Sequence, residues 1–290
     1  MENPVTSCFP DPGGERALRG LYLDTILPDA SAGGGPFIYA NYVSSLDGRI
    51  SVPDAAGRQC VPGNIANPRD WRLLQELAGH ADLLLSSGRY LRELDAGTDQ
   101  DILPIGSAED FADIRAFRAR HGLKPQPDVA VLSGSLDFAV PERLLDQGRR
   151  VVAITGDSAP EARLQAHERA GIEVMPLPGA LRPGARPLAN ALASLGHARI
   201  YAISGPYVLH TLMAADLLDA LFLTTVHRII GGYPFSSICE GELLASPGDF
   251  RLTSLYHDPS GPDGCSQTFA RYERARDPDS VLAGNATGGQ

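Results

Sequence analysis

Apolar segments rich in β-branched residues alternate along the chain with segments whose apolar residues recur at helical spacing. The first kind predicts strands and the second predicts helices. The predicted strands cover residues 37–43, 82–86, 128–132, 151–155, 172–176, 199–203 and 221–230. The predicted helices cover residues 69–78, 108–120, 141–147, 159–170, 188–195 and 206–217. This alternation predicts a three-layer α/β fold, in which helices cover both faces of a mostly parallel sheet. Residues 250–257 and 268–272 predict an antiparallel C-terminal hairpin at one edge of that sheet.

The two ends of the chain do not follow the alternation. Residues 1–35 show little periodicity, apart from a short helix predicted over residues 14–23. We therefore expect an N-terminal extension at residues 1–35 that packs on or near one main domain at residues 36–275. The polar, Gly-rich tail at residues 276–290 is predicted to be flexible.

The stretch at residues 198–232 has the order strand, glycine turn, helix, strand. Pro206 suits the first position of a helix, where its missing N–H costs nothing. A strand that enters a helix through Gly205 leaves backbone N–H groups pointing at open space, and Ser204 adds a hydroxyl. Such a turn is an anion site suited to the phosphates of a nucleotide. Many glycine turns of this kind bind nothing, so a purely structural role is the alternative.

Composition narrows the classes of function. The net charge of −10 argues against a general nucleic-acid binder, although a local basic pocket for a phosphorylated ligand stays open. No apolar run approaches the roughly 20 residues that span a bilayer. Residues 1–16 lack the basic and apolar regions of a signal peptide, so we expect a cytoplasmic protein that binds neither nucleic acid nor membrane. The four cysteines and seven histidines are scattered without metal-ligand spacing, and no metal site is predicted.

Three segments together resemble one known family. They are NYVSSLDGRIS at residues 41–51, NPRDWRLLQELAGHADLLLSSG at 67–88 and SGPYVLHTLMAADLLDALFLTTVHRIIGG at 204–232. In order and spacing they are similar to the reductase domain of the riboflavin-biosynthesis deaminase/reductase family, which has a dihydrofolate-reductase-like fold. The resemblance covers residues 36–275. The H-x-E and P-C-x-x-C zinc motifs of that family's deaminase half do not occur in this sequence.

The resemblance implies an NADPH-dependent oxidoreductase, usually a homodimer. The family's enzyme is 5-amino-6-(5-phosphoribosylamino)uracil reductase, which reduces the ribosyl group of a phosphoribosylamino-pyrimidine to a ribityl chain. The nicotinamide carries this chemistry, while the protein supplies position and charge. Two alternatives are a reductase of the same fold that acts on a pterin or another carbonyl or imine, and a non-catalytic nucleotide-binding paralogue.

On this resemblance, cofactor contacts fall on residues at the carboxyl ends of predicted strands, where ligands bind in such sheets. These residues are Ser86, Ser87, Gly88, Thr155, Gly156, Ser158, Ser204, Gly205, Pro206 and Tyr207. The turn at residues 204–207 would hold the pyrophosphate, and residues 155–158 suit the adenosine ribose. Asp157 would repel a 2′-phosphate but suits the free 2′-hydroxyl of NADH, so NADH stays open beside NADPH.

Ser45 and Asp47 follow the first predicted strand and are candidates on the substrate side. Asp47 is predicted to be catalytic, by orienting a substrate group or relaying a proton during hydride transfer. The alternative for Asp47 is turn chemistry, because Asp-Gly is a frequent turn pair. Arg69, Arg72 and Arg89 are candidates for binding a substrate phosphate, with an ordinary solvent-exposed role as the alternative for each.

The sequence departs from the family pattern mainly on the substrate side. Residues 202–204 read Ala-Ile-Ser where the family usually has an acidic residue before G-G-P. Gln75 and Glu76 stand where it usually has an arginine, and residues 89–93 replace its D-D-P. Residues 219–221 read Asp-Ala-Leu in place of D-E-L. We infer that reduction is retained and that the substrate can differ from the riboflavin intermediate.

Overall fold

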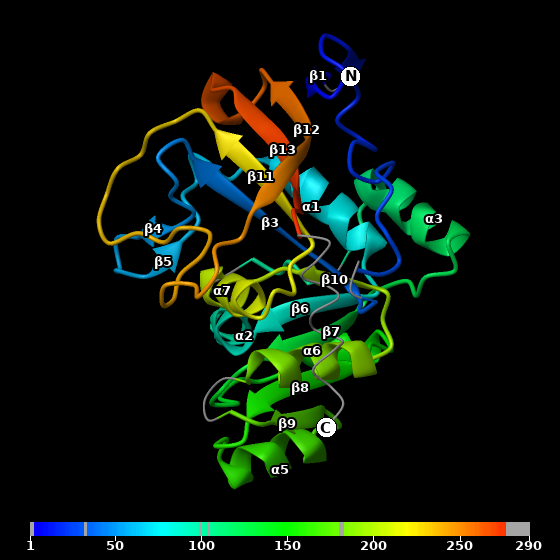
Figure 1. The fold of residues 1–290 in the computed structure, drawn as a ribbon, viewed down its shortest axis with the longest axis vertical. Helices are drawn as coiled ribbons and strands as arrows, with labels where there is room; N and C mark the ends of the chain where they lie inside the picture. The colour runs from blue at the N-terminus through cyan, green and yellow to red at the C-terminus, as the bar shows by residue number, and fades with distance from the viewer. Residues whose placement is uncertain (1–2, 32–33, 99, 104, 180–182, 277–290) are drawn as a thin grey trace.

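The computed structural model describes residues 3–31, 34–98, 100–103, 105–179 and 183–276 (Figure 1). Its main sheet has eleven strands in the order β2-β1-β12-β13-β11-β3-β10-β6-β7-β8-β9. These strands are β1 (Val5–Phe9), β2 (Glu15–Arg16), β3 (Phe37–Ser45), β6 (Leu83–Ser87), β7 (Asp128–Leu132), β8 (Val151–Gly156), β9 (Glu173–Leu177), β10 (Arg199–Ala202), β11 (Ala220–Val226), β12 (Phe250–Asp258) and β13 (Gln267–Arg274). A separate pair consists of β4 (Val52–Pro53) and β5 (Gln59–Cys60). The helices are α1 (Pro68–His80), α2 (Gly88–Asp95), α3 (Ala112–Arg120), α4 (Glu142–Asp146), α5 (Glu161–Arg169), α6 (Ala185–Ser194) and α7 (Pro206–Ala214).

The predicted fold class is confirmed. Strands β11, β3, β10, β6, β7, β8 and β9 are mutually parallel. Strands β13, β12, β1 and β2 continue the sheet in antiparallel pairing. The central parallel strands are continuous apolar runs, as in residues 83–85, because helices bury them on both faces.

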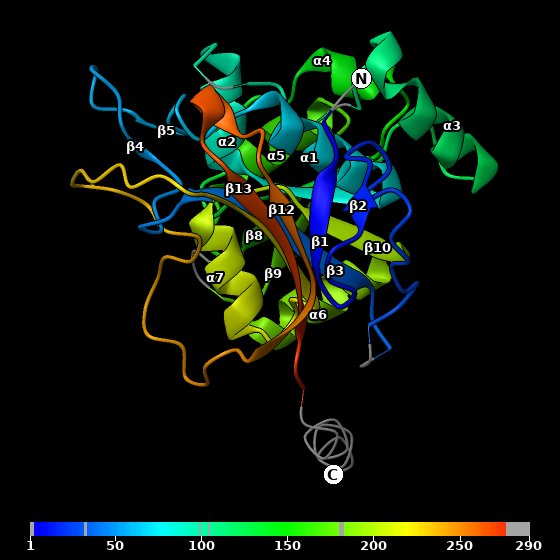
Figure 2. The same cartoon turned by 90° about the horizontal axis from the view of Figure 1, so that it is seen from above.

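Helices cover the two faces of the sheet unequally (Figure 2). Helices α1 to α5 pack on one face, where Leu73 of α1 shares a core cluster with Tyr39 of β3. Helices α6 and α7 pack on the other face, where Leu192 and Leu209 share a second cluster with Ile38 of β3. Ile38 and Tyr39 are consecutive, and successive side chains of a strand point to opposite faces of the sheet. One strand therefore contributes side chains to both core clusters.

The change from one face to the other falls between the neighbouring strands β10 and β6. β6 continues into α2 on the α1 face, whereas β10 continues into α7 on the opposite face. At such a switch point the two segments leave the sheet in opposite directions, and open α/β sheets bind their ligands in the crevice there, at the carboxyl ends of the strands. The fold therefore sets the turn at residues 204–206 beside the turn at residues 87–88.

The N-terminal extension packs on the main domain as strands and turns. β1 pairs with β12, and β2 pairs with β1. The helix predicted over residues 14–23 is wrong. Gly20 has a φ of +91°, and the N–H groups of Gly20, Tyr22 and Leu23 donate to the carboxylate of Glu76 on α1. These N–H groups therefore bind a side chain instead of the backbone carbonyls that a helix would use.

The strand predicted over residues 221–230 is too long at its carboxyl end. Asp47 accepts hydrogen bonds from the N–H groups of Ile230 and Gly231, which hold the chain after β11 in a loop. The domain boundaries of the sequence analysis stay predictions. Residues 277–290 of the predicted tail lie outside the described residues.

Candidate cofactor and substrate site

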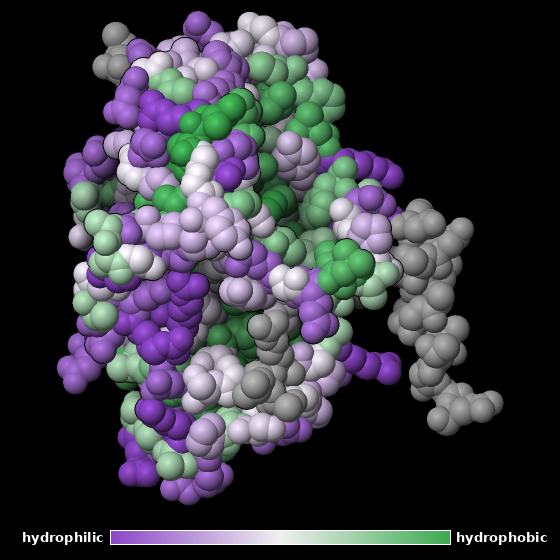
Figure 3. Space-filling view, turned by 90° about the vertical axis from the view of Figure 1, so that its left-hand side faces the viewer, coloured by the Kyte–Doolittle hydropathy of each residue, from purple (hydrophilic) through white to green (hydrophobic). Residues whose placement is uncertain are grey.

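The N-terminus of α7 lies at the carboxyl edge of the parallel strands, on the side of the molecule that Figure 3 turns toward the viewer. Gly205 is its N-cap residue and Pro206 its first helical residue, and no side chain caps this helix start. Gly205 is exposed, and the space that a Cβ would take there is open. Because an uncapped helix start favours anions, the turn is suited to a phosphate. The N–H of Val208 is already used, since it donates to the carbonyl of Gly205 at 3.1 Å.

Three hydroxyls near the carboxyl ends of the strands have no hydrogen-bond partner among the described residues. They belong to Ser86 in β6, Thr155 in β8 and Ser204 directly after β10. Ser86 and Thr155 are fully buried. A buried hydroxyl without a partner costs free energy, so such groups are normally paired by the protein, by water or by a ligand. All three are predicted to bind cofactor, and that role stays a prediction.

The neighbouring predicted residues Ser87 and Gly88 have local structural roles. The Ser87 hydroxyl caps α2 by accepting a hydrogen bond from the N–H of Tyr90 at 3.2 Å. A Cβ at Gly88 would lie 2.6 Å from the hydroxyl oxygen of Ser133, so close packing between α2 and the end of β7 requires glycine. Both residues lie at the carboxyl end of β6, where α2 begins.

The predicted adenosine-side residues lie farther along the same edge. β8 is separated from β10 by β6 and β7, which places Thr155 and Gly156 roughly 14 Å from the α7 turn. The Ser158 hydroxyl donates to Asp157 at 3.3 Å, and the other carboxylate oxygen of Asp157 accepts from the N–H of Gly179. The structure thus aligns the predicted cofactor residues along one edge, with the phosphate turn at one end of the row.

Asp47 joins two loops at the carboxyl ends of β3 and β11. Its carboxylate accepts hydrogen bonds from Arg49 Nη1 at 2.7 Å, from the N–H of Gly231 at 2.9 Å and from the Ser45 hydroxyl. The weaker contact with the N–H of Ile230 spans 3.4 Å. These donors, the Ser45 hydroxyl foremost, lower the pKa of Asp47 to about 2. A carboxylate so held is a poor proton donor at neutral pH, and the geometry favours the alternative of turn and loop chemistry for Asp47.

The three candidate arginines have different surroundings. Arg69 pairs with the fully buried carboxylate of Asp258 at 2.7 Å. Arg72 is buried between Glu76 and Asp113 and binds both. Arg89, in the first turn of α2, is about half exposed and pairs only with the neighbouring surface residue Glu93 among the described residues. Of the three head groups, that of Arg89 is thus the least engaged by the fold.

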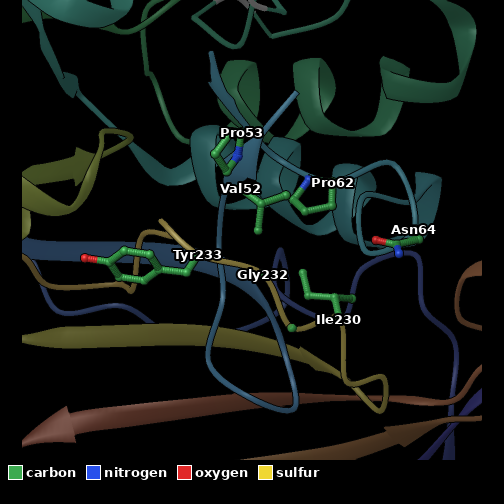
Figure 4. A pocket seen from close by; sticks show the side chains of 8 residues that line it. Val52, Pro53, Pro62, Asn64, Ile230, Gly232 and Tyr233 are labelled. Atoms are coloured by element: carbon green, nitrogen blue, oxygen red, sulfur yellow. The ribbon is translucent and has the colours of Figure 1, made fainter. Parts of the chain in front are cut away.

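A pocket that the sequence analysis missed lies next to the Asp47 loops (Figure 4). Its volume is about 390 Å³. The lining residues are Val52, Pro53, Pro62, Asn64, Ile230, Gly231, Gly232 and Tyr233. They come from β4, from the segment before α1 and from the loop after β11, so no local sequence pattern marks the pocket. The paired glycines 231 and 232, both with positive φ, were the one sequence signal at this place.

A comparison with models of protein families shows to which family the chain belongs. The model of the RibD C-terminal domain matches residues 36–263. The chain belongs to this family. Membership confirms the family predicted from the three motifs and, with it, an oxidoreductase of the riboflavin-biosynthesis reductase type. The matched residues begin after β1 and β2, so these two strands lie outside the region that the RibD C-terminal domain model covers.

Individual relatives agree with membership of the RibD C-terminal domain family. A 2,5-diamino-6-ribosylamino-4(3H)-pyrimidinone 5′-phosphate reductase from Archaeoglobus fulgidus is 24% identical over 208 residues, which is 71% of this chain and 87% of that protein. The crystal structure of a pyrimidine reductase-like protein from Corynebacterium diphtheriae aligns with a TM-score of 0.64 and 23% identity, over 83% of this chain and 93% of the other. The riboflavin biosynthesis reductase Rib7 from yeast (Saccharomyces) aligns with a TM-score of 0.56 and 13% identity, over 88% and 99%. Among the described residues, no helix is both long and apolar enough to cross a bilayer.

Proposed function

We propose that this member of the RibD C-terminal domain family reduces the ribosyl group of a phosphoribosylamino-pyrimidine, with NADPH as the hydride donor. The substrate class follows the name of the Archaeoglobus relative. The observation that carries the cofactor is the uncapped start of α7 at the carboxyl end of β10, where the hydroxyl of Ser204 has no partner among the described residues. A dinucleotide binds at such a place, the switch point of the sheet.

The residues present fit a nicotinamide cofactor. Gly205 and the first turn of α7 would hold its pyrophosphate, with the hydroxyl of Ser204 as a donor. Toward β8, the unpaired hydroxyl of Thr155 would bind the adenosine ribose. When bound, the cofactor supplies the hydride. Asp157 keeps NADH open as a second donor, because its carboxylate lies on the same edge and would repel a 2′-phosphate.

On the substrate side, Asp47 acts as a positioning residue. Through Ser45, Arg49 and Gly231 it fixes the ends of β3 and β11 in one arrangement. We retain Arg89 as the candidate for the substrate phosphate, since its guanidinium is about half exposed at the start of α2. We propose no ligand contact for Arg69 and Arg72, because both are used inside the fold.

Two experiments, carried out one after the other, test this proposal by measuring cofactor binding and then turnover. NADPH and NADH are each titrated while thermal unfolding is followed, since a ligand that binds only the folded state raises the melting temperature. Oxidation of the bound cofactor is then followed at 340 nm with the ribosylaminopyrimidine phosphate as substrate. A melting temperature that neither cofactor moves at millimolar concentration contradicts the reductase assignment. Binding without turnover favours the non-catalytic alternative.

The assembly and the location of the protein are further proposals. The family resemblance implies a homodimer, which sedimentation equilibrium of the purified chain tests directly. A cytoplasmic location stays a prediction.

A further inference from the structure

The carboxyl group of Asp70 is buried, and among the described residues no cation pairs with it. Asp70 is the third residue of α1 and is 7% exposed. Its Oδ1 atom has no hydrogen-bond partner in the described part of the chain. Burial raises the pKa of Asp70 to about 6, against the lowering effect of a hydrogen bond with the Thr224 side chain. Above pH 7 the protein therefore holds a buried carboxylate that is short of donors.

The other buried carboxylates of the described residues are all paired with cations. The pairs are Glu76 with Arg72, Asp128 with Lys124, Asp219 with Arg276 and Asp258 with Arg69. Removing a charge from water costs free energy that a partner must offset, so buried charges are normally paired. Asp70 is thus the buried carboxylate that remains open to pairing with water or a ligand.

Asp70 lies beside an uncovered part of β3. The Thr224 side chain that bonds Asp70 belongs to β11, where it stands opposite Val43 of β3. Val43 and Asn41 point to the same face of the sheet as Tyr39, which is the face that carries α1. Both are partly exposed, although β3 has a neighbouring strand on each side. The carboxyl half of β3 is therefore accessible on this face, next to Asp70.

The uncovered part of β3 lies between Asp70 and the turn that is proposed to hold the cofactor. β3 separates β11 from β10, whose carboxyl end leads into α7. Two strand spacings amount to about 10 Å. Burial, and after it the charges of Tyr39 and Asp70, raise the pKa of Tyr201 in β10, so Asp70 lies near this strand as well. A ring bound at Asp70 can extend a ribosyl substituent over β3 toward the cofactor.

The substituent at C2 of a pyrimidine ring decides how the ring meets a carboxylate. A 2-amino-4(3H)-pyrimidinone carries two adjacent donors, the ring N3–H and the exocyclic amine. The corresponding uracil has a carbonyl oxygen in place of the amine, and that acceptor would face the acceptors of the carboxylate. Two parallel N–H bonds to a carboxylate are strong and depend on direction. A site built for such donors rejects an analogue that lacks one of them.

We propose that Asp70 contacts the pyrimidine ring and selects a substrate with an amino group at C2 over the uracil form. Its two oxygens accept the N3–H and one hydrogen of the amine, while Thr224 holds the carboxyl in place. This inference rests on the proposed function, because it supposes a ribosylaminopyrimidine substrate. It also gives the reaction a place in a sequence, since the ribosyl group is then reduced before a deamination converts the 2-amino ring to the uracil.

Two fragments that differ in the substituent at C2 test the contact without turnover. The probes are 2,6-diamino-4(3H)-pyrimidinone and 6-aminouracil, each titrated by calorimetry into the protein loaded with NADPH. We expect the 2-amino fragment to bind about 30-fold more tightly, because a hydrogen bond to a charged group is gained and a repulsion is avoided. With the complete substrates, kcat/KM should favour the 2-amino form over the uracil form by about 100-fold.

Asp70→Asn keeps the shape of the side chain and replaces one acceptor by a donor. We expect the preference in kcat/KM to fall to about threefold or less, with the affinity for NADPH unchanged. The melting temperature should stay level or rise, since an unpaired buried charge is removed. Glu161→Gln is the matched control, because it removes an exposed carboxylate from the first turn of α5 and should leave the preference at C2 unchanged.

Equal binding of the two fragments by the wild type overturns the proposal, and this outcome does not depend on how well the variant folds. A preference at C2 that Asp70→Asn retains also overturns it, and then assigns the free oxygen to a buried water, such as one shared with the unpaired hydroxyl of Tyr22. Failure of the proposed function shows itself separately, as absence of NADPH binding or of turnover with either pyrimidine.

Discussion

The crevice between β10 and β6 and the buried ion pair of Arg72 and Glu76 on α1 both contain polar side chains. The two regions differ in whether the protein itself supplies hydrogen-bond partners for these side chains. In the ion pair, Glu76 binds Arg72 and also accepts three backbone N–H groups of the N-terminal extension. At the neighbouring carboxyl ends of β6 and β10, Ser86 and Ser204 have hydroxyls without partners among the described residues. A polar group that its own chain satisfies serves the fold, whereas a buried group without a protein partner remains open to pairing with water or a ligand.

The largest effect is expected on stability, when the hydrogen bonds of the buried carboxylate of Glu76 are removed. Glu76→Ala leaves three backbone N–H groups without an acceptor and removes one of the two carboxylates that pair with the buried guanidinium of Arg72. We expect the free energy of unfolding to fall by about 3 kcal/mol, as measured by urea denaturation. Glu93→Ala is the matched control, because it removes the same type of i, i+4 pair from the surface of α2 and should cost at most about 0.5 kcal/mol. Equal losses in the two variants would show that burial and backbone capping add nothing at Glu76.

The next effect falls on the crevice. Gly205→Glu places a carboxylate in the open space beside the start of α7, against the phosphates of the proposed cofactor. Like-charge repulsion should weaken NADPH binding by about 100-fold in a fluorescence titration. Gly205→Ala is the control, since φ is −71° and nothing lies within 4 Å of the added Cβ, so its affinity should remain that of the wild type. If Gly205→Glu binds NADPH as the wild type does, the phosphates do not lie at this turn.

Asp47 lies near the crevice, but its carboxylate already accepts hydrogen bonds from the protein itself. Its pKa of about 2 in the folded protein is below the ordinary value of 3.8. The ionised form is therefore stabilised by folding, and this contribution is present above pH 4 and lost as the pH falls toward 2. Asp47→Asn should lower the stability at neutral pH by about 1 kcal/mol and flatten the stability profile between pH 4 and pH 2. Chemical denaturation at several pH values measures both effects.

The same variant distinguishes positioning from proton transfer. As a positioning residue, Asp47 should affect turnover through the geometry of the loops, so Asp47→Asn lowers kcat/KM with NADPH affinity unchanged. The pH dependence of the residual rate keeps its shape, because no ionisable catalytic group is lost. A pH profile that loses a limb in Asp47→Asn would restore the catalytic role that the sequence suggested.

The parts of this fold that the sequence predicts are those with local signals. Continuous apolar runs such as residues 83–85 mark buried parallel strands, and Pro206 marks the first residue of α7. Helix α2 was not predicted, because residues 88–95 carry charged residues and only Ser87 signals a helix start. Strand β1 was missed because its pairing with β12 joins residues about 250 positions apart, and no pattern within the extension specifies that partner.

In the candidate site, too, residues with local sequence signals could be predicted, whereas contacts between distant segments could not. Small residues at strand ends were local signals, and they placed Ser86, Thr155 and Ser204 at the carboxyl edge of the sheet, where we propose the cofactor. The partners of Arg69 could not be predicted, because Asp258 lies 189 residues away. The pocket beside the Asp47 loops combines β4, the segment before α1 and the loop after β11, and no one of them carries a sequence signature of it. Sequence reasoning therefore recognises which residues can bind, but only the assembled fold shows which of them are already used.

The smallest effects are expected from substitutions at Ser86 and Ser87, two neighbouring residues of β6 whose hydroxyls differ in whether the protein uses them. Ser86→Ala removes a buried hydroxyl that has no partner among the described residues, so we expect the stability of the free protein to stay level or rise. Its affinity for NADPH should fall about fivefold, the value of one hydrogen bond. Ser87→Ala removes the cap of α2 and should cost about 1 kcal/mol of stability. Thermal unfolding with and without NADPH compares the two neighbours, and a loss of stability in Ser86→Ala without any change in NADPH affinity would mean that its hydroxyl serves the fold after all.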